Sequence, residues 1–71
     1  MNNTPPHVER MIAEGEQLVD RVEKLGAFLV GPVYKTLPED EQVLMGAQVG
    51  AMTAYLHILT LRISRATGGA A

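Results

Sequence analysis

Residues 42–61 constrain this chain more than any other stretch, because these twenty residues include no Asp, Glu, Lys or Arg. Apart from the phenol of Tyr55, His57 is the only titratable side chain among them. A surface helix normally has a charged face, and a helix that lacks one is usually buried on several sides. The stretch therefore predicts a long helix that needs more than one neighbour to cover it.

The spacing of side chains predicts one apolar seam along this helix, with two further faces beside it. The seam follows steps of four and three residues and comprises Met45, Val49, Met52, Leu56, Leu59 and Ile63. A second apolar face comprises Leu44, Ala47, Ala51, Tyr55 and Ile58, and a narrow third face comprises Gly46, Gly50, Thr53, His57, Thr60 and Ser64. A single partner helix covers only one of these faces, so the chain is expected to associate with other chains.

Local signals predict the bounds of two helices. The second helix is expected from about residue 37 to residue 66, after a capping box formed by Thr36 and Glu39, and a glycine pair at 68–69 ends it. The first helix is expected from about residue 5 to residue 30, with Thr4 as its N-cap and Gly31 in the left-handed conformation after its end. Disorder is expected at residues 1–3, and a flexible tail at residues 67–71.

The first helix is amphipathic, and its apolar positions are Val8, Met11, Ile12, Leu18, Val19, Val22, Leu25 and Leu29, with Gly15 in the seam. The short connection at residues 31–36 makes the two helices antiparallel neighbours. Folding the chain about residue 33 pairs Val22 with Met45, Leu18 with Val49, Gly15 with Met52, Met11 with Leu56 and Val8 with Leu59. The predicted fold class is all-α: residues 1–71 form a single antiparallel two-helix hairpin domain that assembles into a symmetric homo-oligomeric helical bundle.

Length and composition also favour association. A core of this size rarely supplies more than ~3–5 kcal/mol of stability, and a chain of 71 residues without cysteine has no disulfides to add to it. Two histidines, far apart in the sequence, do not suggest a zinc site, so no metal or cofactor is expected. A net charge of −2 gives no basic footprint for duplex nucleic acid. The N-terminal residues show neither a cationic region nor an apolar run, so no signal peptide is expected.

A transmembrane helix is the competing interpretation of residues 42–61, since their length and composition suit a bilayer. Gln48 and His57 are costly in hydrocarbon, and Gln48 lies near the middle of the stretch. No aromatic belt flanks the stretch. A helix buried in a soluble oligomer is therefore preferred over a membrane span.

The sequence shows no catalytic constellation, and no enzyme is expected. At the predicted hairpin tip, Phe28 and Tyr34 can stack nucleobases, and Lys24 and Lys35 can meet phosphate. The alternative is that the two rings plug the end of the core while the lysines are solvated. The open end gathers His7, Arg10, His57, Arg62 and Arg65, which can hold an anion or simply compensate the helix dipole.

Three blocks of the sequence resemble a widespread group of short bacteriophage proteins that form helical hairpins. The blocks are residues 21–29 (RVEKLGAFL), 34–44 (YKTLPEDEQVL) and 48–63, the last through Gln48, Met52, Tyr55, Leu59, Arg62 and Ile63. The group is similar in size and architecture to the phage anti-CBASS and anti-Thoeris sponges, small helical proteins that form symmetric oligomers and sequester cyclic-nucleotide immune signals without cleaving them. The Tyr of the sponge motif is followed fifteen residues later by Lys, whereas Tyr34 leads to Val49, so no binding residue transfers by alignment.

The resemblance implies a phage counter-defence protein that sequesters a cyclic di- or trinucleotide, in pockets between protomers, in the cytoplasm of an infected bacterial host. The candidate ligand-binding residues follow from their chemistry alone: Phe28 and Tyr34 for stacking, and Arg10, Lys35 and Arg62 for phosphate. A protein-interaction module that blocks a host or phage protein is the alternative. A small membrane hairpin is the less favoured alternative.

Overall fold

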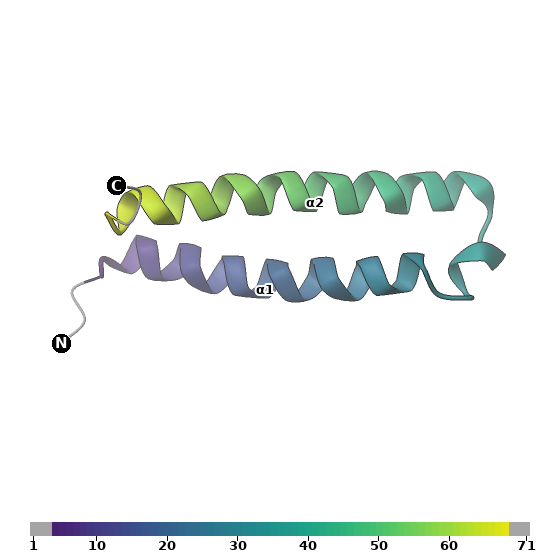
Figure 1. Ribbon diagram of the computed structural model, residues 1–71, viewed down its shortest axis with the longest axis horizontal. Helices are drawn as coiled ribbons and strands as arrows, with labels where there is room; N and C mark the ends of the chain where they lie inside the picture. The colour runs from purple at the N-terminus through teal and green to yellow at the C-terminus, as the bar shows by residue number, and fades with distance from the viewer. Residues whose placement is uncertain (1–3, 69–71) are drawn as a thin grey trace.

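The computed structural model describes residues 4–68 as an antiparallel helical hairpin. Helix α1 spans Pro6–Leu29, a short 3₁₀ helix η1 spans Tyr34–Thr36, and helix α2 spans Glu39–Ala66, with no strand among the described residues. The two long helices lie side by side, and the start of α1 and the end of α2 are at the same end of the rod (Figure 1). The predicted all-α hairpin is confirmed. Residues 1–3 and 69–71, on which the expected disordered start and most of the flexible tail fall, lie outside the described part.

The inner seam of α2 is the one that the sequence predicts. All six of its residues, from Met45 to Ile63, are buried or partly shielded, and Leu59 is only 1% exposed. On α1, Val8, Gly15 and Leu18 are buried, whereas Val19 is 40% exposed and lies at the margin of the contact. The second apolar face of α2 is exposed throughout, and its third face is exposed except at Ser64. Within one chain, therefore, α1 covers a single stripe of α2.

The register between the helices differs from the predicted one by about two helical turns. A Cβ placed on Gly15 would lie 3.7 Å from a terminal carbon of both Leu59 and Ile63, so the predicted pairing of Gly15 with Met52 is wrong. Met52 instead shares a pocket with Leu25 and Phe28. The helices thus pair about a point near residue 37 rather than residue 33.

The connecting segment explains the shifted register. Residues 30–38 do not reverse the chain at once but lie beneath the first turns of α2, which extend past the end of α1 (Figure 1). The hydroxyl of Tyr34 donates a 3.0 Å hydrogen bond to the carbonyl of Gln42, and the Gln42 side-chain amide donates to the carbonyl of Leu37 at 2.9 Å. These bonds hold the segment against α2. The connection is therefore longer than the tight turn about residue 33 that the sequence predicts, and this shifts the register.

Helix α2 begins without the predicted capping box. Its N-cap is Pro38, and the hydroxyl of Thr36 donates a 2.6 Å hydrogen bond to the carbonyl of Val33, the N-cap of η1. The residue before a proline is driven towards extended backbone, and Leu37 accordingly has φ −77° and ψ 153°. Because this extended residue separates Thr36 from the helix, the hydroxyl cannot reach the first N–H groups of α2.

The ends of α1 also differ from the prediction in two details. The N-cap is Pro5 rather than Thr4. The left-handed conformation expected at Gly31 is wrong, since among the described residues only Gly68, after α2, has a positive φ, 73°. The N–H of Gly31 instead donates to the carbonyl of Phe28 at 3.1 Å, which closes α1 with a tight 3₁₀-type turn.

The hairpin exposes more surface than a compact chain of its mass. Its accessible area is 5351 Å², whereas a folded monomer of 7.7 kDa is expected to expose about 4,300 Å². Large apolar side chains account for part of the excess, and Val43, Leu44, Ile58 and Leu61 on α2 are each more than half exposed. By length and composition alone, α2 is also apolar enough to cross a membrane. The apolar surface that α1 leaves uncovered on α2 is consistent with the expected association with other chains, which stays a prediction.

Substitutions at Gly15 test the observed register. Gly15→Ala fits at van der Waals distance from Leu59 and Ile63, and we expect it to raise the free energy of unfolding by about 0.5–1 kcal/mol, because alanine loses less backbone entropy in a helix. Gly15→Leu overpacks the same contact and should lower the free energy of unfolding by about 1–3 kcal/mol. Urea denaturation followed by circular dichroism measures both.

Gly26→Leu is the matched control, because a Cβ at Gly26 meets nothing within 4 Å. It should not destabilise the hairpin. Equal effects of the leucine substitutions at Gly15 and Gly26 would show that the helices do not pack in this register.

Candidate functional site

One side of the hairpin is formed by two lines of residues spaced seven apart, which is close to two helical turns. On α1 the line comprises His7, Glu14, Arg21 and Phe28, and on α2 it comprises Glu41, Gln48, Tyr55 and Arg62. The hydroxyl of Tyr55 donates a 2.6 Å hydrogen bond to Oε2 of Glu14, which joins the two lines midway along the rod. We call this surface the basic side, because Arg10, Arg21, Lys24, Arg62 and Arg65 lie on or beside these lines.

The opposite side of the hairpin has a different character. Its α1 line is acidic and comprises Glu9, Glu16 and Glu23, while its α2 lines carry mostly small residues such as Gly46, Gly50, Thr53 and Thr60. A hollow on that side is lined by Glu16 and Thr60 together with apolar residues of the inner seam. The chain is acidic overall, yet five of its six Lys and Arg side chains are on one side. An anionic ligand therefore has one preferred side on which to bind.

A shallow pocket near the tip combines aromatic, cationic and amide groups. It has a volume of about 380 Å³ and is lined by Arg21, Lys24, Leu25, Phe28, Gln48 and Met52. Its apolar lining residues Leu25, Phe28 and Met52 are partly buried, whereas Arg21 and Lys24 are exposed. Nζ of Lys24 is 3.0 Å from Oδ2 of Asp20, but both side chains are more than half exposed, and such a pair contributes little energy. A phosphate can therefore replace Asp20 as the partner of Lys24 at little cost.

A second basic hollow lies at the open end of the rod. It has a volume of about 420 Å³ and is lined by His7, Met11, Arg62, Arg65 and Ala66. Both arginines are also near the C-terminus of α2, where cations offset the helix dipole. The geometry therefore suits either of the two roles expected for this end of the chain.

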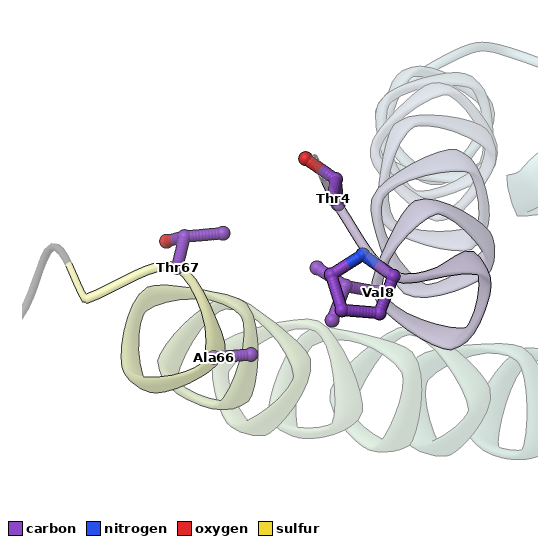
Figure 2. Close-up of a pocket in the computed structure, with 5 residues that line it drawn as sticks. Thr4, Val8, Ala66 and Thr67 are labelled. Carbon is purple, nitrogen blue, oxygen red and sulfur yellow. The ribbon is translucent and has the colours of Figure 1, made fainter. Parts of the chain in front are cut away.

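A third hollow, between the start of α1 and the end of α2, is lined by Thr4, Pro5, Val8, Ala66 and Thr67 (Figure 2). Its lining has no charged side chain, and the hydroxyl of Thr67 already donates to the carbonyl of Ile63 at 2.9 Å. This hollow has the chemistry of a helix end rather than that of a ligand site.

The five predicted site residues are distributed over the whole rod. Phe28 lines the tip pocket and Arg62 lines the hollow at the open end, while Arg10 is exposed on α1 one turn beyond His7. Lys35 is exposed in η1, and Tyr34 is partly buried with its hydroxyl bonded to the carbonyl of Gln42. Gln48, opposite Phe28, and Arg62 are fourteen residues apart on one helix, so they are separated by about 21 Å. One protomer alone cannot place Phe28 and Arg62 on the same small ligand.

Arg21 and Gln48 complete the tip pocket, and sequence reasoning had not selected either of them. Their signal was the seven-residue spacing that places Arg21 on the line of Phe28, and Gln48 on the line of Arg62. His57, which the sequence places both on the small-residue face of α2 and near the open end, is exposed and is not among the residues that line the hollow at that end. Among residues 4–68 no cluster of three or more His, Asp or Glu side chains is positioned to hold a metal ion.

The described residues define a small all-helical hairpin with a basic side and a pocket that combines an aromatic ring with two cations. Residues 5–65 match the family model described as Sequestin, and the chain belongs to the Sequestin family. The family's name indicates a sequestering function. Comparison with curated proteins and with solved structures gives no match.

The link between Tyr55 and Glu14 predicts a pH dependence. The hydrogen bond to the Glu14 carboxylate raises the pKa of Tyr55 above its ordinary value of about 10, and desolvation and the negative charge of Glu14 act in the same direction. The neutral phenol is thereby favoured in the folded chain. This contribution to stability is fully present below about pH 10 and is lost as the pH rises through the raised pKa.

The ring resonances of Tyr55, followed by NMR as the pH is raised, measure this pKa. In Glu14→Gln the amide still accepts a hydrogen bond but has no charge, so the pKa of Tyr55 should fall back towards its ordinary value. An unchanged pKa in this variant would mean that Glu14 does not face Tyr55 in solution.

Proposed function

We propose that this protein is a phage counter-defence protein that binds and sequesters a cyclic oligonucleotide immune signal without cleaving it. It would act in the cytoplasm of an infected bacterial host. The tip pocket is the observation that carries this proposal, because Phe28 lines it together with two cations, Arg21 and Lys24, in a chain of the Sequestin family. The family supports sequestration in general, and the chemistry of the pocket supports a nucleotide as the ligand.

Each group at the tip matches a part of a nucleotide. The ring of Phe28 offers a stacking surface for a base, and such stacking is tolerant of sequence. The guanidinium of Arg21 and the ammonium of Lys24 suit phosphate oxygens, and the amide of Gln48 can both donate to and accept from a base edge. Lys35 adds positive charge near this end. Tyr34 is proposed to support the pocket from the turn as well as to stack.

The pocket suits binding better than hydrolysis. Its polar lining groups are Arg21, Lys24 and Gln48, of which two are cations and the third is an amide without a basic nitrogen. A general base within hydrogen-bond reach of the attacking group is the usual requirement for hydrolysis of a phosphodiester without a metal. These three side chains can stabilise a phosphate but cannot take a proton from water, which supports a ligand that is held intact.

The shallowness of the pocket supports a site shared between protomers. Small-molecule sites usually bury roughly 70–90% of the ligand surface, and a pocket that is open on one face cannot do this alone. A second protomer that brings Arg10 or Arg62 to the same ligand would close the site and supply further charge for its phosphates. The separation of Phe28 and Arg62 within one chain is then no obstacle.

A protein-interaction module is the second candidate, and the exposed apolar face of α2 is the observation that favours it. Val43, Leu44, Ile58 and Leu61 are available to a helix of a host or phage protein. A small membrane hairpin is the lesser candidate, supported by the length and composition of α2. If this chain, purified from infected cells, carried a second protein in a fixed stoichiometric ratio and no nucleotide, the protein-interaction module would replace the sequestration proposal.

Titration calorimetry with a panel of cyclic di- and trinucleotides tests the proposal. At least one of them should bind, and mass spectrometry of the denatured complex should return it uncleaved. Phe28→Leu keeps an apolar side chain but removes the stacking surface, so we expect binding to weaken roughly fivefold to a hundredfold. Absence of heat across the panel at micromolar protein would reject a cyclic nucleotide as the ligand.

Tyr34→Phe is the matched control for that series. It keeps the aromatic ring and removes only the hydroxyl that donates to the carbonyl of Gln42. Nucleotide affinity should stay within about twofold of the unsubstituted protein, because the stacking face is preserved. A loss in Tyr34→Phe equal to that in Phe28→Leu would show that both substitutions act through the fold rather than through the pocket.

A further inference from the structure

The outer surface of α2 carries a second seam, which we call the outer seam. It follows alternating steps of four and three residues and comprises Asp40, Leu44, Ala47, Ala51, Ala54, Ile58, Leu61 and Arg65. Every one of these residues is exposed in the hairpin, and none of them belongs to the inner seam that packs against α1. An apolar repeat with a mean spacing of 3.5 residues is the pattern by which two helices pack as a coiled coil.

The outer seam is complementary to a second copy of itself that runs in the opposite direction. It begins with an acid and ends with a base, a leucine follows each end, and alanines occupy its middle. When two copies are placed antiparallel and centred between residues 52 and 53, the residue numbers of each facing pair add up to 105. The facing pairs are then Asp40 with Arg65, Leu44 with Leu61, Ala47 with Ile58, and Ala51 with Ala54. Large side chains thereby meet small ones beside the centre, and the central alanines allow the helices to approach closely.

We infer that α2 pairs antiparallel with α2 of a second copy of this chain, through the outer seam. The charges at the ends select the direction: antiparallel packing sets Asp40 against Arg65 at both ends, whereas parallel packing would set like charges against each other. Glu41 and Arg62, next to these residues, repeat the same preference. An unrelated partner would need to match this pattern by coincidence, while a second copy matches it by symmetry.

The exposed area agrees with a second copy as the occupant. The hairpin exposes about 1,000 Å² more than a compact chain of its mass, and a standard interface buries about 800 Å² on each partner. One additional hairpin is therefore enough to cover the surplus. The pairing is argued from α2 alone and does not depend on the ligand.

The pairing has a consequence for the basic side, and this step alone rests on the proposed function. A twofold axis perpendicular to two antiparallel helices turns the same side of both hairpins in the same direction. Arg62 of the second copy then faces position 43, about 8 Å along the axis from Gln48 at the tip pocket. Phe28 of one copy and Arg62 of the other thereby border one continuous basic surface.

Cross-linking of cysteine variants tests the pairing, because the chain has no cysteine of its own. Leu44→Cys and Leu61→Cys are exposed positions that lie outside the inner seam, and the two variants are made with tags of different mass and mixed. A short thiol cross-linker should join Leu44→Cys chains to Leu61→Cys chains. It should not join two Leu44→Cys chains, whose thiols would be about 25 Å apart in the antiparallel pair.

Products that join two chains of the same variant would indicate parallel packing and would overturn the inference. A monomeric mass in native mass spectrometry would overturn it as well. So would recovery of the protein with phosphatidylcholine vesicles on flotation without any cross-link, because lipid would then cover the outer seam. A failure of nucleotide binding leaves these results unchanged, so the two proposals fail separately.

A charge exchange at the ends provides a second test that leaves the apolar seam intact. Asp40→Arg and Arg65→Asp each create two like-charge contacts, and each should weaken dimerisation by roughly three- to tenfold. The double variant restores opposite charges and should restore most of the affinity. Glu23→Arg, on the exposed face of α1, is the control and should leave the dimer unchanged. Failure of the double variant to recover affinity would contradict the antiparallel pairing.

Discussion

The structure depends on one imbalance: α2 is apolar around most of its circumference, and within residues 4–68 α1 is the only other long helix that can cover it. A helix in contact with one neighbour buries a stripe, and here that stripe is the inner seam from Met45 to Ile63. The remaining apolar surface of α2 stays in contact with water in a single chain. Hydrophobic stabilisation scales with the apolar area removed from water, so the isolated hairpin leaves a large part of its potential stability unused.

The same imbalance gives the two sides of the rod different charges. Since residues 42–61 of α2 include no Asp, Glu, Lys or Arg, most of the charged side chains belong to α1, and their seven-residue spacing gathers three acids, Glu9, Glu16 and Glu23, on one line. Arg21 falls on one side with Phe28, while Glu16 and Glu23 fall on the other. The hairpin thus presents a basic side, an acidic side and an apolar edge, although the described part of the chain forms only two long helices.

Sequence periodicity predicted the helices and the inner seam well, because a repeat of three and four residues determines which face of a helix is buried. It could not predict the register, which depends on how the connection at residues 30–38 packs. The bond from Tyr34 to the carbonyl of Gln42 is a tertiary contact that no local pattern specifies. The register also determines the composition of the candidate site: the sequence grouped Phe28 with Tyr34 and Lys35, and the observed register brings Gln48 and Met52 of α2 to the pocket that Phe28 lines.

The proposed sequestration and the proposed pairing reinforce each other through mass action. A ligand that contacts Phe28 of one copy and Arg62 of the other binds the pair but not the single hairpin, so ligand binding must stabilise the pair by the same free energy by which pairing strengthens ligand binding. A protein that removes a signal without destroying it needs high affinity, because every bound molecule returns to solution when the complex dissociates. Rigid helices that are already paired lose little entropy when the ligand arrives, and this is the condition under which a small interface retains a ligand tightly. Under these two proposals the apolar edge of α2 and the basic side of the hairpin would contribute to one function, because the edge would hold two copies in a fixed geometry and that geometry would complete the site.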